Sequence, residues 1–149
     1  MKGMTIIVKE VTALVIGFIL LYSINLILSG HLTPGGGFVG GVMLACGFIL
    51  LVLSFGKEKV NTLISDRSIT LWDCSGAFAF LVIALLGYFT GDFFANFLTR
   101  PGNYRLFSGG TIPLANIAIG IKVGACMAGA FIALTLFRGP RESFPGGKP

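Results

Sequence analysis

The sequence has few charged residues, one histidine and three cysteines. Only 11% of its 149 residues are Asp, Glu, Lys or Arg, whereas about 25% is usual for soluble domains. Its one histidine excludes a multi-histidine metal or haem site within this chain alone. Its three cysteines have no CxxC spacing, which argues against a disulfide framework and a zinc knuckle. We therefore expect no catalysis by this chain alone, no bound metal and no cofactor.

The apolar residues are abundant and gathered into long runs. They make up 54% of the chain, and the mean hydropathy is +0.90. A chain this small has a large surface for its volume, and so few charges could not cover it in water. At 1.5 Å per residue, a run of about 20 apolar residues crosses the roughly 30 Å hydrocarbon core of a bilayer. We predict an all-α integral membrane protein, a single domain over residues 1–149 with four transmembrane helices at about 11–29, 38–55, 74–91 and 112–137.

The charges outside these runs predict the orientation. Eight basic residues lie before the first run, between the second and third, or after the fourth, and only Arg100 and Arg105 lie in the other two connections. This bias predicts that both termini are in the cytoplasm. We expect the chain to be a multi-pass protein of the plasma membrane. The charge bias also explains the net charge of +5 without a nucleic-acid partner. The eight are Lys2, Lys9, Lys57, Lys59, Arg67, Arg138, Arg141 and Lys148.

A glycine-rich segment joins the first two predicted helices, from His31 to Gly41. Its proline disfavours helix at the preceding residue, and its glycines permit backbone angles that side chains forbid. Two interpretations remain open: a tight hairpin with close helix packing, or a polar pocket at the positive end of the second helix. His31 is a candidate for proton transfer near neutral pH or for a simple hydrogen-bonding role. The structural motif comprises Pro34, Gly35, Gly36, Gly37, Gly40 and Gly41.

Lys122 is the sharpest candidate for a functional residue because it lies in the middle of the fourth predicted helix. A lysine at this depth is costly in a membrane, and it marks an ion or proton pathway more often than a purely structural site. Asp73 and Asp92 fall at the ends of predicted helices. We therefore expect its partner to be water or another polypeptide. Asn116, one turn into the same helix, is either a hydrogen-bonding contact between helices or part of the same pathway.

The segment Gly30-His31-x-x-Pro34-Gly-Gly-Gly-Phe-x-Gly-Gly41, after a first apolar helix, resembles the MrpB (MnhB) family. These are small subunits of multisubunit Na+/H+ antiporters, with related subunits in archaeal membrane-bound hydrogenases and sulfane reductases. The resemblance implies that the chain packs among other Mrp-type subunits in a module that exchanges Na+ for H+ across the bilayer. Stand-alone antiporter members tend to carry an Asp near the start of the last helix, where this chain has Asn116. That difference favours the hydrogenase-type relatives and argues against a sodium ligand on this helix.

The function expected is therefore that of a small membrane subunit in an antiporter module of a hydrogenase-type respiratory complex, contributing to the sodium/proton path. Two alternatives stay open. One is a purely structural subunit that seals the module, and the other is a small homo-oligomeric channel. An unpaired Lys122 argues against the channel, because copies would bring like charges together.

Overall fold

The structure is a computed structural model that describes residues 4–32, 34–56, 60, 65–96, 98 and 109–137. Within these residues the chain forms the helices α1 (Ile6–Leu28), α2 (Gly36–Phe55), α4 (Asp66–Leu86) and α5 (Ile112–Phe137), with a 3₁₀ turn η1 (Gly87–Thr90) that extends α4. Four spans among them are long enough to cross a membrane, with mean hydropathies between 2.0 and 2.5. The prediction of an all-helical chain with four helices long and apolar enough to span a membrane is confirmed. The side of the membrane that each end faces stays a prediction from the loop charges.

Two helices begin earlier than the apolar runs predicted. Helix α1 begins at Ile6 instead of residue 11, and α4 begins at Asp66 instead of residue 74. In both cases the apolar run was taken to begin after a charged residue, Glu10 or Asp73. A charged side chain near a helix end does not interrupt the backbone hydrogen bonds, so the helix extends past it. Ser65 is the N-cap residue of α4, with an extended backbone whose carbonyl accepts bonds from the N–H groups of Ser68 and Ile69.

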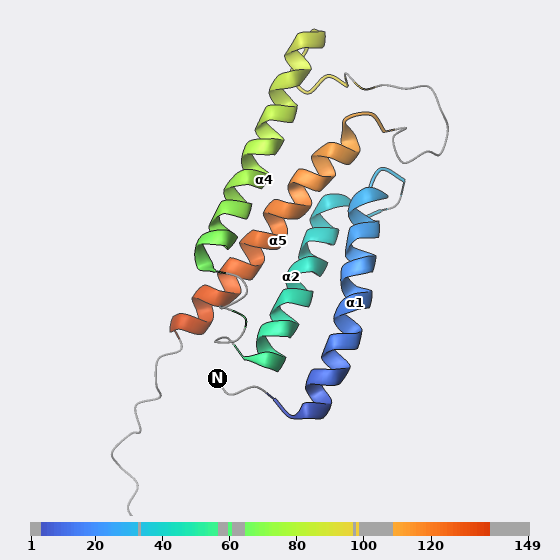
Figure 1. The fold of residues 1–149 in the computed structure, drawn as a ribbon. Coiled ribbons are helices and arrows are strands. Elements are labelled where there is room, and N and C mark those ends of the chain that lie inside the picture. The colour runs from blue at the N-terminus through green and yellow to red at the C-terminus, as the bar shows by residue number, and fades with distance from the viewer. Residues whose placement is uncertain are drawn as a thin grey trace, which may run out of the picture.

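The helices are arranged in the spatial order α1, α2, α5, α4, which differs from their order in the chain (Figure 1). Helix α5 lies between α2 and α4, so α4 packs mainly against α5 at one edge of the row. Figure 1 also shows α4 shifted along its axis, so that it rises above the other helices at the η1 end. This shift brings the first half of α4 beside the middle of α5.

Small residues fill the helix contacts, and large apolar side chains point outward. Among the described residues, the largest side chains that are less than 2% exposed are those of Ser23 and Ser54, whereas Phe18 is 70% exposed and Phe78 is 67% exposed. A protein folded by burial from water shows the reverse pattern. Lipid tails are as apolar as leucine, so membrane helices associate instead through close contacts of small residues. The outward side chains are placed to contact lipid or neighbouring proteins.

Among the described residues, three polar side-chain contacts join one helix to another. The hydroxyl groups of Thr12 and Ser54 are 2.7 Å apart between α1 and α2, and both residues are buried. The Ser23 hydroxyl donates a 2.7 Å bond to the carbonyl of Gly40 on the same pair of helices. The third contact is an ion pair between α4 and α5.

Candidate functional site

The glycine-rich segment forms a tight connection between α1 and α2. Gly35 has a φ of +143° and Gly36 a φ of +60°, and such angles are strained for residues with side chains. Gly35 is the N-cap residue of α2, which has no side-chain cap. Pro34 is exposed just before it. The chain therefore reverses direction here because two glycines adopt left-handed backbone angles.

The glycines of α2 lie where the helix touches its two neighbours. A Cβ atom at Gly37 would overlap the backbone carbonyl of Asn116 on α5, and one at Gly41 would lie 2.7 Å from the carbonyl oxygen of Gly120. Gly40 faces the other way, and a Cβ there would overlap the Ile27 side chain on α1. The motif residues are thus brought together at a contact of three helices. We name this contact between α1, α2 and α5 the glycine seam.

The Asn116 side chain lies against the connection between α1 and α2. A Cβ at Gly30 would be 2.7 Å from its Nδ2 atom, and a Cβ at Gly36 would be 3.3 Å from its Oδ1 atom. The Nδ2 atom is buried and has no hydrogen-bond partner among the described residues. The amide therefore occupies space that two glycines leave open, at the end of the bundle where α5 begins.

His31 lies at the same end of the bundle, in contact with the segment before α5. His31 is half-buried, and a Cβ atom added at Gly109 would be 3.1 Å from the Cγ atom of its ring. The α5 start next to it is held by Asn96, whose Oδ1 accepts a 3.0 Å bond from the Thr111 N–H. His31 and Asn116 thus belong to one region of the molecule, and Lys122 belongs to another.

Lys122 forms an ion pair with Asp73 of α4, with 2.9 Å between Nζ and Oδ1. The expectation that its partner is water or another polypeptide is therefore wrong for its first contact. The reason is the early start of α4, which places Asp73 seven residues, or roughly 10 Å, inside the helix. Lys122 is ten residues, or roughly 15 Å, from the start of α5. The pair lies at mid-depth of a bilayer-sized bundle.

The close approach of α4 and α5 at the pair depends on Gly76. A Cβ there would lie 2.8 Å from the backbone nitrogen of Lys122 and 3.0 Å from the carbonyl oxygen of Ala118. Gly76 follows Asp73 by three residues, so both lie on the same side of α4. The absent side chain lets the two backbones approach, and the Asp73 carboxylate then reaches the lysine. We name this contact, with its pair, the charged seam.

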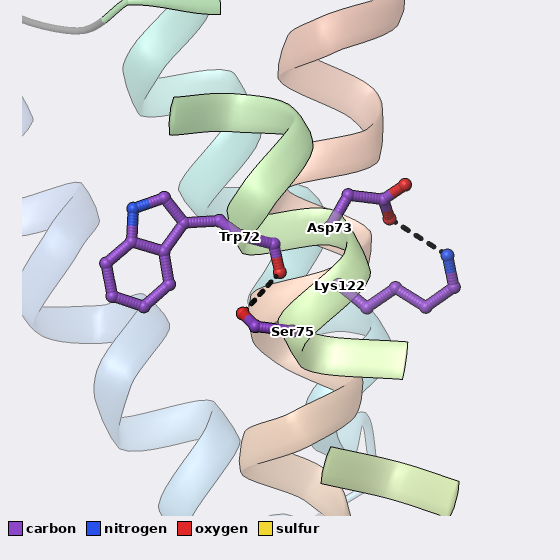
Figure 2. A network of polar contacts seen from close by, with 4 residues as sticks. All are labelled: Trp72, Asp73, Ser75 and Lys122. Atoms are coloured by element: carbon purple, nitrogen blue, oxygen red, sulfur yellow. Dashed lines mark hydrogen bonds and ion pairs between the residues drawn. The ribbon is translucent and has the colours of Figure 1, made fainter. Parts of the chain in front are cut away.

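The ion pair faces outward from the bundle. The Lys122 side chain is 45% exposed and that of Asp73 is 34% exposed. Figure 2 shows the two side chains meeting beside α4, with the Trp72 ring on the other side of that helix. Trp72 instead lines an apolar groove of about 520 Å³, together with residues of the other three helices such as Leu20, Phe48 and Ala128. A membrane-depth ion pair therefore lies on an open face, and the groove lies elsewhere.

Sequence reasoning missed Asp73 because the third apolar run was taken to begin immediately after this charged residue. A signal for it was present in the residues before it. The polar residues Ser65 and Asp66 are typical of a helix start, and Ser68, Ile69 and Leu71 can continue a helix to Asp73. A helix that starts at the cap carries Asp73 into the membrane.

The described residues contain no group of three or more His, Cys, Asp or Glu that could hold a metal ion. Three regions of chemical interest remain: the His31 and Asn116 end, the glycine seam and the charged seam. Of these, the charged seam alone brings together ionised side chains within a membrane span among the residues described.

Comparison with known proteins identifies relatives along nearly the whole chain. A family model described as a domain related to the MnhB subunit of Na+/H+ antiporter matches residues 7–139. A Na+/H+ antiporter subunit of Bacillus subtilis, of the B type, is 34% identical over 138 residues, which are 92% of this chain and 93% of that protein.

Two longer relatives match as well. An uncharacterized protein of Methanocaldococcus jannaschii is 33% identical over 116 residues, or 73% of this chain and 44% of that protein. A chain in the structure of an archaeal respiratory membrane complex, the membrane-bound sulfane sulfur reductase, superposes with a TM-score of 0.72 at 31% identity. The match covers 85% of this chain and 56% of that chain. Each of these two relatives is much longer than the segment that this chain matches.

Proposed function

Because the chain belongs to the MnhB family of Na+/H+ antiporter subunits, we propose that it contributes to the sodium/proton path of an antiporter module. In this proposal it is a small, non-catalytic subunit of a hetero-oligomeric complex in the plasma membrane, with both termini in the cytoplasm. The module belongs to a membrane-bound respiratory complex of the hydrogenase or sulfane reductase type. The likeness to a chain of such a complex supports this assignment.

The observation that carries the proposal is the Lys122–Asp73 pair, half-exposed at mid-depth. Ionisable residues within membrane spans are costly, and they concentrate on ion pathways. Either transported ion can act on this pair. A proton that binds the Asp73 carboxylate removes its negative charge, and a sodium ion at the carboxylate competes with the Lys122 ammonium. Each event releases the ammonium, so the pair can change state when one ion replaces the other.

The test compares variants of the pair in everted membrane vesicles, with Na+-driven proton movement measured by a pH-sensitive dye and assembly measured on native gels. Lys122→Met keeps the length and apolar packing of the side chain but removes its charge. We expect exchange to fall about a hundredfold, the lower end of what loss of a proton-transfer group costs. Asp73→Asn should have the same effect. Lys9→Met, near the start of α1, is the matched control and should exchange normally.

A double variant separates transport from structure. Lys122→Met with Asp73→Leu removes both charges, so no unpaired charge is left within the membrane. We expect this variant to assemble as well as the wild type and to remain inactive in exchange. Recovery of exchange in the double variant would show that the pair is structural.

A second candidate is a stand-alone Na+/H+ antiporter, and the close match in length to the Bacillus subtilis protein favours it. Purification of the intact complex decides between the two. A respiratory complex should contain redox subunits with bound metal or flavin, and a stand-alone antiporter should contain neither.

The argument from charge against a homo-oligomeric channel no longer holds, because Lys122 is paired with Asp73 and copies of the chain would not bring unpaired charges together. Family membership nonetheless favours unlike partners.

A further inference from the structure

The face of α4 and α5 that carries the ion pair is open over more than one turn. Helix α4 lies at the edge of the row and packs mainly against α5 (Figure 1). Small exposed residues lie beside the pair: Cys74 and Ala77 on α4, and Cys126 and Ala130 on α5. Cys126 and Ala130 follow Lys122 at four-residue intervals, so they continue its side of the helix. A neighbouring backbone can therefore come close to this face.

The pair itself has unused hydrogen-bonding capacity. The Lys122 ammonium has three N–H donors and uses one on the Oδ1 atom of Asp73. No second bond to either group comes from the described residues. Hydrocarbon offers neither donors nor acceptors, so lipid tails cannot serve as the cover of this face.

We infer that a transmembrane helix of an unlike subunit packs on this face and brings a neutral amide or hydroxyl side chain to the pair. Such a group can accept a bond from the ammonium and donate one to the carboxylate at the same time. A charged side chain fits less well, because the pair is already neutral and a third charge would lack a partner. The small exposed residues favour a helix over a bulkier element. The inference rests on the proposed hetero-oligomeric complex and does not depend on ion transport by the pair.

The test uses Cys126, one turn from Lys122, as the attachment point for a photoreactive probe. A variant with Cys46→Ser and Cys74→Ser keeps Cys126 as its only cysteine. The complex is dissociated in detergent, labelled with benzophenone maleimide, reassembled in lipid, illuminated and analysed by mass spectrometry. We expect a cross-link to one transmembrane helix of an unlike chain, within a turn of an Asn, Gln, Ser or Thr.

The matched control keeps Cys46 instead, which is also exposed but lies on α2. It should not cross-link to the same helix. Accessibility gives a second readout that needs no bulky probe: Cys126 should lose its reaction with N-ethylmaleimide when the chain is assembled and regain it when the complex is dissociated.

Adducts with lipid alone, or with a second copy of this chain, would overturn the inference. So would a cross-linked helix with no neutral polar side chain at that depth, or unchanged labelling of Cys126 on assembly. Ion exchange is measured separately in the variants of Lys122 and Asp73. The cross-linking result therefore stands if the pair proves not to be part of the ion path, and the exchange result stands if no helix is cross-linked.

Discussion

Glycine allows close contact between helices in both seams, but the two contacts differ in what lies beside the glycine. In the glycine seam, Gly37, Gly40 and Gly41 bring α2 against α5 and α1, and no ionised side chain is present. In the charged seam, a single glycine, Gly76, brings α4 against α5 beside a half-exposed ion pair. The first contact is closed and lies inside the bundle. The charged seam lies on an exposed face of the chain.

This difference separates the part of the protein that holds the helices together from the part that can respond to ions. A backbone contact between glycines has no group that a proton or sodium ion can change. The Asp73 carboxylate and the Lys122 ammonium are groups that an ion can act on. Because both side chains are partly exposed, a neighbouring protein or water can reach them. We therefore expect substitutions in the glycine seam to act mainly on assembly, and substitutions in the charged seam to act mainly on exchange.

The largest effect is expected from Gly37→Val, because the Cβ atom of the valine would overlap the backbone of Asn116. Backbone cannot rotate out of the way as a side chain can, and overpacking of this kind costs about 3 kcal/mol or more. The amount of assembled complex on native gels should fall to a small fraction of the wild-type amount. Gly17→Val on α1 is the matched control, since a Cβ there has nothing within 4 Å. Equal assembly of the two variants would contradict the packing role of the seam.

A smaller effect is expected from Gly76→Ala in the charged seam. The new methyl group would lie 2.9 Å from the Lys122 Cβ, so α4 must move away from α5 by a small amount. Overpacking by one methyl group costs about 1–3 kcal/mol, which should leave much of the complex assembled. Exchange should fall more than assembly does, because the distance between Asp73 and Lys122 changes. If assembly falls more than exchange, the proposed contrast between the seams is wrong.

The smallest effect is expected from Thr12→Val between α1 and α2. The change keeps the shape of the side chain and removes the hydroxyl that faces Ser54. Hydrogen bonds between membrane helices contribute about 0.6 kcal/mol on average, so thermal unfolding in detergent should shift by only a few degrees. Adding Ser54→Ala should recover part of the loss, since it removes the unpaired hydroxyl. Exchange should remain normal in both variants, and a loss of exchange would extend the functional region to this contact.

Much of the fold followed from the sequence because the bilayer restricts the choice. A run of about 20 apolar residues without charge has few alternatives to a spanning helix. The bounds of α2 and α5 agree with those predicted to within two residues. The starts of α1 and α4 were predicted late, because Glu10 and Asp73 were treated as ends of the spans. The predicted importance of Lys122 and of the glycine motif came from unusual residues in apolar surroundings, which local sequence reveals.

The sequence by itself determined the four long apolar helices of the described residues, the positions of most of their ends and the hairpin at Gly35 and Gly36, since these depend on hydropathy and on local backbone freedom. It did not determine that α4 lies on the far side of α5 from α2, nor that α4 is shifted along its axis. Those features decided that Lys122 meets Asp73, 49 positions away in the chain. Contacts at that distance arise from helix packing, where Gly76 allows an approach that no local pattern specifies. The tertiary structure alone could therefore show that the membrane-depth lysine is paired and that the pair faces outward.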